Sequence, residues 1–171
     1  SPEFSSHSVT CNSPSKAFNI AGLQIANIIV PDNDMRTRID RAININEVCD
    51  VNPFGVEALI AAYNEGEEWL SQLLAYLKGN DDFMWDFCRQ NLPQFPLTRL
   101  EGTYLEWMDC KTIGLASAEL EKRLIDEAGL WLNAGTMYGA EGEGFMRWNI
   151  ACPRSRLTEG LERFRQYISS L

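Results

Sequence analysis

The sequence predicts a mixed α/β chain, and three observations support this fold class. Residues 23–30 (LQIANIIV) form an apolar, β-branched run that stops at Pro31, which is typical of a buried strand. Apolar side chains recur at helical spacing over residues 67–92, which indicates one long helix. Helix-like and strand-like segments continue to alternate after it, so both kinds of element share the chain.

The elements before residue 66 are one further strand and two helices. Residues 8–12 are expected to end a strand that leads into the loop around Lys16. Apolar residues at helical spacing predict a helix over residues 33–45. Pro53 suits the first turn of a second helix, which we expect to run to about residue 64.

The long helix and the elements after it complete the predicted order. Gly79 weakens the middle of this helix and Pro93 ends it, and its apolar stripe is interpreted as a core-facing seam. The later elements are an antiparallel strand pair at 97–100 and 103–108, a helix at 116–128, strands at 130–133 and 145–151, and a helix at 155–168.

Composition excludes several classes of function. The chain is acidic, with a formal charge of −9 and dispersed basic residues, so we expect no nucleic-acid partner. No apolar run approaches the roughly 18–20 residues of a membrane span, so we expect no membrane partner either. His7 is the only histidine, which excludes histidine-based triads and metal clusters; we predict no metal site.

The cysteines predict a reducing compartment. They are odd in number and contain no CxxC pair, so neither a disulfide framework nor a zinc site is indicated and a cytoplasmic location is expected. These residues are Cys11, Cys49, Cys88, Cys110 and Cys152.

Lys16 is the residue with the clearest chemical potential. A nearly uncharged run follows it as far as Pro31, and an ammonium in such surroundings is desolvated, which favours a nucleophilic amine of the Schiff-base type. Ser13 and Ser15 beside it could contact an anionic group such as a phosphate. From the residues alone, a surface lysine next to a Ser-Pro turn is the commoner interpretation. The other lysines have polar or charged neighbours: Lys78, Lys111 and Lys122.

Arg147 is the second candidate. Alternation along its strand places Met146 and Trp148 on the opposite face from Arg147. A lone arginine on a short apolar strand needs an anion, and its planar fork suits a carboxylate. On periodicity alone, a structural salt bridge is the simpler alternative to substrate binding.

Four segments in order resemble a known family. Residues 12–23 (NSPSKAFNIAGL) resemble its cofactor-lysine segment, and residues 142–154 (GEGFMRWNIACPR) resemble its Gly-rich turn, carboxylate-binding strand and Cys-Pro-Arg helix start. Residues 101–105 and 133–139 match two further segments. The family is that of the pyridoxal-phosphate (PLP) dependent class I/II aminotransferases of fold type I, and the likeness is greatest to its cystathionine β-lyase-like C–S lyase branch (MalY/PatB type).

The resemblance implies a domain organisation. Residues 5–62 would be the C-terminal remnant of the large PLP-binding domain, including the lysine loop, and residues 63–171 the small C-terminal α/β domain with a bridging helix. Residues 1–4 (SPEF) suggest a cloning scar, so we expect a C-terminal fragment of a longer protein. Its expected partners are the N-terminal part of the same protein and a second copy in a homodimer.

The resemblance also implies site residues and a reaction. Lys16 would bind pyridoxal 5'-phosphate covalently and act as general base, Ser13 and Ser15 would bind the phosphate, Arg147 would bind the carboxylate of an amino-acid substrate, and Tyr104 would line its pocket. Tyr138 is a further pocket candidate, and a core role stays open for both tyrosines. The implied reaction is β-elimination of sulfur amino acids to pyruvate, ammonia and a thiol; the alternative is transfer of the amino group to a 2-oxo acid.

Departures from the family pattern qualify these expectations. Many relatives carry an arginine eight residues after the lysine, but Gln24 stands here, which favours the lyase branch. The family's groups for the pyridine ring and for much of the phosphate precede the lysine and are not in this chain. We therefore expect the chain alone to bind PLP poorly or not at all and to be inactive; the alternative is a non-catalytic dimerising domain. Apolar surface exposed over residues 18–62 is expected to lead to self-association or to a rearranged N-terminal segment.

A different class shares the Ser13-x-x-Lys16 pattern. Penicillin-recognising serine hydrolases use it as their nucleophile motif, together with Ser-Asp-Asn and Lys-Thr-Gly elements. The chain has no Ser-Asp-Asn, and residues 111–114 (KTIG) only imitate the third element. This reading is therefore disfavoured.

Overall fold

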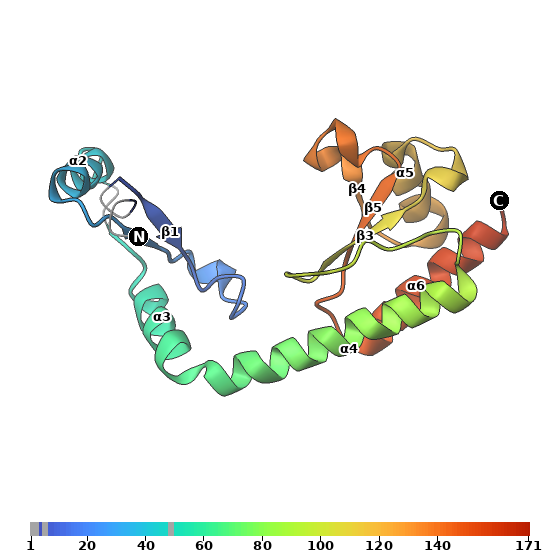
Figure 1. Ribbon diagram of the computed structural model, residues 1–171, viewed down its shortest axis with the longest axis horizontal. Coiled ribbons are helices and arrows are strands. Elements are labelled where there is room, and N and C mark those ends of the chain that lie inside the picture. The colour runs from blue at the N-terminus through green and yellow to red at the C-terminus, as the bar shows by residue number, and fades with distance from the viewer. Residues whose placement is uncertain (1–3, 5–6, 48–49) are drawn as a thin grey trace. The chain divides into compact units, whose positions relative to one another are not determined.

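The computed structural model describes residues 4, 7–47 and 50–171 (Figure 1). It divides into two compact units, Ser1–Leu73 and Leu74–Leu171, so the division lies inside helix α4 (Glu67–Asn91). The domain boundary predicted between residues 62 and 63 stays a prediction. Apart from Phe4, the predicted cloning scar lies outside the described residues, as does Cys49.

The first unit begins with a short antiparallel pair, β1 (Thr10–Asn12) and β2 (Asn27–Ile29). Helix α2 (Asn33–Asn44) follows, and its first turn is capped because Asp32 accepts a hydrogen bond from the Met35 amide. In α3 (Pro53–Glu65), Pro53 occupies the first turn as predicted, and the Asn52 side chain caps the helix.

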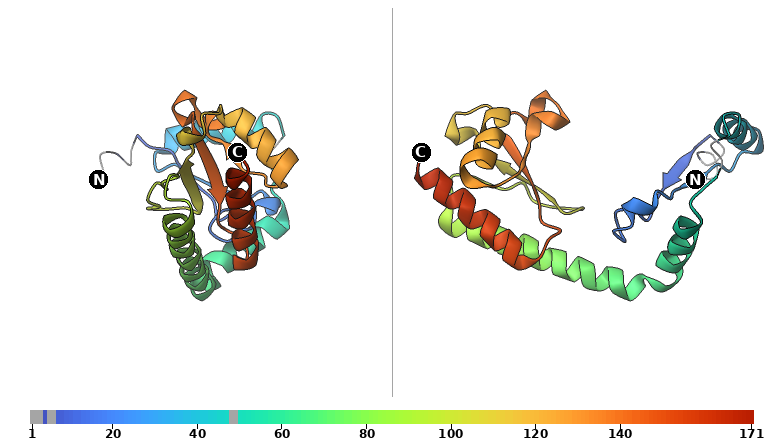
Figure 2. Two further views of the ribbon diagram at one scale, coloured as in Figure 1. Left: turned by 90° about the vertical axis from the view of Figure 1, so that its right-hand side faces the viewer. Right: turned by 180° about the vertical axis from the view of Figure 1, so that it is seen from behind.

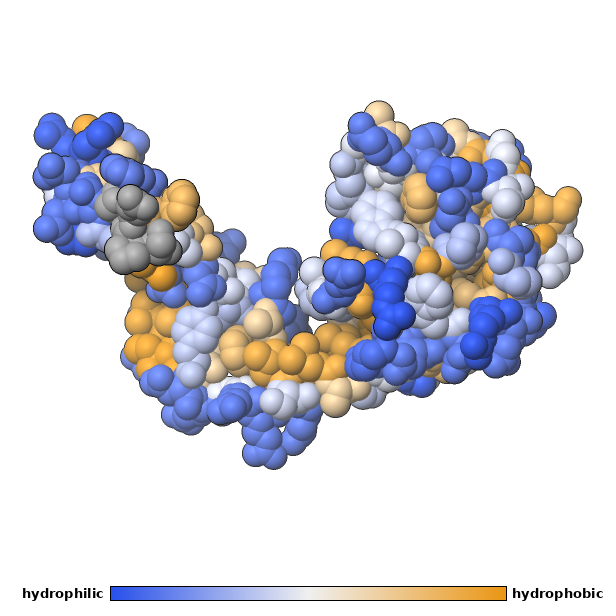
Figure 3. Space-filling view, viewed as in Figure 1, coloured by the Kyte–Doolittle hydropathy of each residue, from blue (hydrophilic) through white to orange (hydrophobic). Residues whose placement is uncertain are grey.

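The buried strand predicted at residues 23–30 is only partly correct. Ala21–Leu23 is a 3-10 turn and Gln24 adopts a left-handed conformation, so the strand is reduced to β2. Ile28 and Ile29 are about half exposed, at 48% and 51%. Other large apolar side chains of this unit are also exposed, among them Phe54, and Figure 3 shows hydrophobic residues gathered over α3 and the beginning of α4.

The second unit is a three-stranded antiparallel sheet with helices on one face. The strand order is β3-β5-β4: β3 (Leu105–Asp109), β5 (Phe145–Asn149) and β4 (Asn133–Ala134). Helices α4, α5 (Ser117–Ala128) and α6 (Arg154–Ser169) supply the rest of the core, and α4 and α6 lie side by side (Figures 1 and 2).

The core confirms the alternation predicted along residues 145–151. Met146, Trp148 and Ile150 are buried, whereas the intervening side chains are partly or fully exposed. Trp148 and Phe95 both meet Phe164 of α6 edge to face, at 5.7 and 5.5 Å between ring centroids. One face of β5 is therefore structural and the other is available for chemistry.

The antiparallel pair predicted at 97–100 and 103–108 is only partly correct. Only one bridge joins these segments, Leu97 with Met108, and β3 pairs instead along its whole length with β5. Pro96 has no backbone N–H to give to a ladder, and Thr103 adopts a left-handed conformation that interrupts the second segment.

Asn80 explains how the long helix tolerates a polar residue at its middle. Its side chain is fully buried and donates hydrogen bonds to the Ile150 and Cys152 carbonyls, at 2.8 and 2.9 Å. Its carbonyl oxygen accepts from Arg154 Nε at 2.8 Å. Arg154 thus holds the start of α6 against α4.

A pair of buried carboxyl groups lies between β3 and α4. Glu106 is fully buried, and burial together with the neighbouring Asp81 raises the pKa of Glu106 to about 8. Burial opposes ionisation of Asp81 as well, but hydrogen bonds from Glu106 and Lys78 outweigh it and lower the pKa of Asp81. At neutral pH, Glu106 is therefore the protonated member of the pair.

We predict that Glu106→Gln removes a pH dependence of stability. Between the unfolded pKa near 4.5 and the folded pKa of about 8, the folded state holds the extra proton, so the free energy of unfolding of the wild type falls as pH rises through that window. Glutamine keeps a donor for Asp81 but does not titrate. Urea denaturation from pH 5 to 9 should show the variant gaining about 3 kcal/mol relative to the wild type.

The exposed Glu101→Gln is the matched control for this prediction, because Glu101 lies just before the same strand. Its curve should run parallel to that of the wild type. A Glu106→Gln curve that also stays parallel would mean that Glu106 does not carry the proton.

Candidate functional site

Lys16 lies in a tight turn between β1 and β2. The Phe18 amide donates to the Pro14 carbonyl at 2.9 Å, and the Ile20 amide donates to the Ser15 carbonyl at 3.1 Å. Pro14 is almost wholly buried, so its packing fixes the beginning of the turn. The main chain therefore holds Lys16 at a defined place on the first unit.

Ser13 and Ser15 form a small hydroxyl cluster beside the lysine. Ser13 Oγ donates to the carbonyl of the buried Ile25 at 2.7 Å and accepts from the Ser15 amide at 3.2 Å. The two hydroxyl oxygens are 2.7 Å apart. Since the Ser13 proton points to Ile25, a phosphate at this place would compete with that carbonyl for it.

The expectation of a dry lysine is wrong for this structure, because Lys16 is exposed. The apolar side chains after it turn elsewhere: the Phe18 ring stacks on Trp69 and meets Tyr63 edge to face, with centroids 6.0 and 6.1 Å away. Among the described residues, the Lys16 amine has no hydrogen-bond or ion-pair partner. It is thus a free primary amine, open to an aldehyde.

Arg147 stands in the centre of a row of side chains across the second unit's sheet. Strand register places it opposite Trp107 of β3 on one side and Asn133 of β4 on the other. Its Nη2 donates to Asn133 Oδ1 at 2.6 Å, and its guanidinium carbon lies 4.5 Å from the centroid of the Tyr138 ring. The half-buried cation is therefore held by a neutral amide and an aromatic face.

The alternative of a structural salt bridge for Arg147 is not borne out within the described residues. None of the carboxylates described there lies within ion-pair distance of its guanidinium, and its Nε is buried without a hydrogen-bond acceptor. A buried donor of this kind is costly unless a partner arrives. The arrangement suits an incoming carboxylate.

The two tyrosines differ in their surroundings. Tyr138 is 50% exposed and meets Trp107 edge to face at 5.5 Å, beside the arginine. Tyr104 packs against the hydrophobic core, and its carbonyl accepts from the Ile150 amide at 3.0 Å. A place for Tyr104 in a substrate pocket stays a prediction.

Sequence reasoning missed Asn133 and Trp107 as companions of Arg147. The signal that identifies them is the strand register, which local patterns do not contain. The pairing of residues 105–109 with 145–149 places Trp107 beside Arg147, and the pairing of residues 133–134 with 146–147 places Asn133 there.

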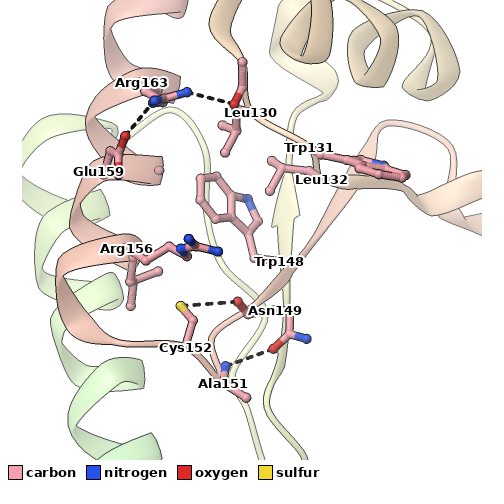
Figure 4. Close-up of a pocket in the computed structure, with 13 residues that line it drawn as sticks. Leu130, Trp131, Leu132, Trp148, Asn149, Ala151, Cys152, Arg156, Glu159 and Arg163 are labelled. Atoms are coloured by element: carbon pink, nitrogen blue, oxygen red, sulfur yellow. Dashed lines mark hydrogen bonds and ion pairs between the residues drawn. The ribbon is translucent and has the colours of Figure 1, made fainter.

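A pocket of about 520 Å³ lies on the other side of β5. Figure 4 shows the indole of Trp148 between Arg156 of α6 and Leu132 of the facing segment. Arg163 closes one end by donating to the Gly129 carbonyl at 2.9 Å and pairing with Glu159 at 2.6 Å. None of the predicted site residues lines this pocket. Those residues form two groups, Ser13, Ser15 and Lys16 in the first unit, and Arg147 and Tyr104 in the second.

Comparison with known proteins identifies relatives for nearly the whole chain. Residues 3–164 match the family model for aminotransferase class I and II. Cystathionine β-lyase PatB of Bacillus subtilis is 39% identical over 169 residues, which cover 99% of this chain and 44% of PatB. Protein MalY of Escherichia coli is 33% identical over 87% of this chain and 38% of its own length. The chain thus spans less than half the length of these relatives.

Solved structures agree in fold. Cystalysin from Treponema denticola, which contains a pyridoxal 5'-phosphate cofactor, superposes with a TM-score of 0.94 at 29% identity, covering 99% of this chain and 43% of cystalysin. The PLP-bound C–S lyase from Staphylococcus hominis gives a TM-score of 0.80 at 34% identity, covering 92% of this chain and 41% of that lyase.

We predict that Ser13→Ala loosens the lysine turn. The change leaves the buried Ile25 carbonyl without its donor, which should cost about 1 kcal/mol and speed amide exchange at Phe18 and Ile20. Hydrogen exchange followed by NMR measures this directly. Ser15→Ala is the matched control, since it retains the bond from Ser13 to Ile25. Unchanged exchange in Ser13→Ala would mean that this bond does not secure the turn.

Proposed function

Because the chain belongs to the class I and II aminotransferase family, we propose that it is part of a PLP-dependent C–S lyase. The reaction is β-elimination from a sulfur-containing amino acid, giving pyruvate, ammonia and a thiol. The observation that carries the proposal is Arg147, a half-buried strand arginine held by neutral groups and free to bind a carboxylate. The likeness to cystathionine β-lyase PatB supports the choice of substrate class.

The lysine turn fits the coenzyme. Lys16 presents an unpaired amine that can condense with the coenzyme aldehyde, and the hydroxyls of Ser13 and Ser15 lie within three residues of it as candidate phosphate ligands. When bound, pyridoxal phosphate accepts the electron pair released at the substrate α-carbon. Additional phosphate ligands are needed, because position 24 is glutamine and Ser13 already donates to Ile25.

The chain's own residues divide the work between them. Arg147 grips the substrate carboxylate through two parallel N–H donors and so fixes the orientation of the α-carbon. The Lys16 amine takes the α-proton as general base. The C–S bond at the β-carbon then breaks with its electron pair leaving on sulfur, and hydrolysis of the remaining product releases pyruvate and ammonia. Tyr104 and Tyr138 are proposed to border the substrate.

An aminotransferase remains the second candidate, because Lys16 and Arg147 serve both reactions up to loss of the α-proton. In transamination Lys16 would pass on the proton that it took from the α-carbon, and no thiolate would leave the substrate. The two reactions differ in what they consume, because only the aminotransferase needs a 2-oxo acid to complete its cycle.

The proposal includes a homodimer in the cytoplasm. The exposed apolar side chains of the first unit, such as Ile28, Ile29 and Phe54, provide surface for the rest of the protein or for a second copy. Cys11, Cys88, Cys110 and Cys152 are free thiols, which is in keeping with a reducing compartment. Among the helices of the described residues, none is long and apolar enough to cross a membrane.

The full-length enzyme should release pyruvate from cystathionine without any added 2-oxo acid. Lys16→Ala should abolish both the covalent coenzyme linkage, measured by borohydride trapping and mass spectrometry, and the pyruvate release. Lys122→Ala is the control, because Lys122 is an exposed lysine that pairs with Asp126. Strict dependence on a 2-oxo acid would establish the aminotransferase instead. A trapped coenzyme in Lys16→Ala would refute the role of Lys16.

The 171-residue chain by itself should bind the coenzyme weakly and turn over no amino acid, because the family's ring-binding groups precede the lysine. Titration with pyridoxal 5'-phosphate, followed by absorbance, measures the affinity. Tight binding accompanied by turnover would contradict this expectation.

A further inference from the structure

The guanidinium of Arg147 is held from two directions by uncharged groups. Asn133 fixes one edge through the 2.6 Å hydrogen bond to Nη2, and Tyr138 covers one face at 4.5 Å. Nη1 and Nε make no hydrogen bond with the described residues, and Nε is buried. The cation is thus positioned while part of its hydrogen-bonding capacity stays open.

The amide of Asn133 is itself oriented. Its Nδ2 contacts Met137 Sδ at 3.8 Å, so the opposite end of the amide, Oδ1, faces Arg147. Thioether sulfur accepts hydrogen bonds only weakly, but contacts at both ends of the amide restrict its rotation. The side chain therefore presents an acceptor, not a donor, to the arginine.

The segment that carries Tyr138 is also constrained. Gly135 packs directly on Gly142, and a Cβ at position 135 would clash with the Gly142 carbonyl oxygen. The Tyr138 ring is supported from the side by Trp107, whose own strand position is opposite Arg147. Backbone contact and an aromatic edge together limit the movement of the ring.

We propose that Asn133 and Tyr138 are positioning residues that align the Arg147 guanidinium for a substrate carboxylate, and this inference rests on the proposed function. Neutral partners suit such a task. They restrict the side chain, which otherwise loses conformational entropy on binding, and they leave its charge unneutralised. An acidic partner would have to be displaced by each substrate.

The test uses the full-length enzyme and two ligands that differ only in the carboxylate, glycine and methylamine. Dissociation constants are obtained from the coenzyme absorption band. Asn133→Ala should weaken glycine binding by about five- to tenfold and leave methylamine binding unchanged. Tyr138→Leu should weaken glycine binding by about threefold. Tyr138→Phe keeps the ring and should weaken glycine binding less than Tyr138→Leu does.

A double-mutant cycle shows whether Asn133 acts through Arg147. In the Arg147→Gln background, Asn133→Ala should no longer change glycine affinity. A full effect that persists in that background, or equal losses for glycine and methylamine, would overturn the inference. If Arg147→Gln itself leaves the preference for glycine unchanged, the proposed function fails first, so the two failures are distinguishable.

Asn133→Asp separates positioning from structural support without relying on the loaded enzyme. A carboxylate at this place would form an ion pair with Arg147, which should raise the thermal midpoint of the coenzyme-free protein by about 2 °C. The same variant should lose glycine affinity by more than Asn133→Ala does, because the cation is already neutralised. Weaker folding together with unchanged glycine affinity would show a purely structural role for Asn133.

Discussion

The antiparallel pairing of β3 with β5 is the constraint on which the second unit depends. It sets Trp107 opposite Arg147 and Glu106 opposite Trp148, so consecutive residues of each strand serve different faces of the sheet. One face packs on Phe164 and its neighbours in the core, whereas the other carries the arginine with its amide and aromatic companions. Neighbouring residues of one strand therefore point to opposite faces, one into the core and the next toward the candidate site.

Polar groups on the buried side of the sheet are accommodated in different ways. Asn80 uses its amide fully, with two backbone carbonyls and the Arg154 side chain as partners. Glu106 avoids an uncompensated buried charge because burial keeps its carboxyl protonated. Arg147 Nε is a buried donor without an acceptor in the described part of the chain, and so is Trp148 Nε1 on the core side. Arg147 differs from Trp148 because it is charged and only half-buried, so its other donors can reach a ligand.

Sequence patterns predicted the helices, the family and fold type I, and these are confirmed. Helix periodicity is local, so α4 and α6 could be placed within a residue or two. Strand partners are not local, and for that reason the predicted pairing of residues 97–100 with 103–108 holds only at one bridge, whereas the main partner of β3 is β5. The exposure of Lys16 was missed because Phe18 packs on Trp69, a contact between residues far apart in the sequence. Asn133 could not be found before the register was known.

The chain has an excess of acidic residues, and the register keeps the nearest one on β3, Glu106, away from the Arg147 guanidinium. A slip of one residue between β3 and β5 would bring Glu106 opposite Arg147 and would turn Trp107 toward the core side. The carboxyl group would then ionise against the guanidinium, and the resulting ion pair would occupy the donors that a substrate needs. This slip is costly, because it would turn the fully buried Met108 of β3 out of the core. The hydrophobic core therefore stabilises the fold and, by fixing the register, also prevents an ion pair between Glu106 and Arg147.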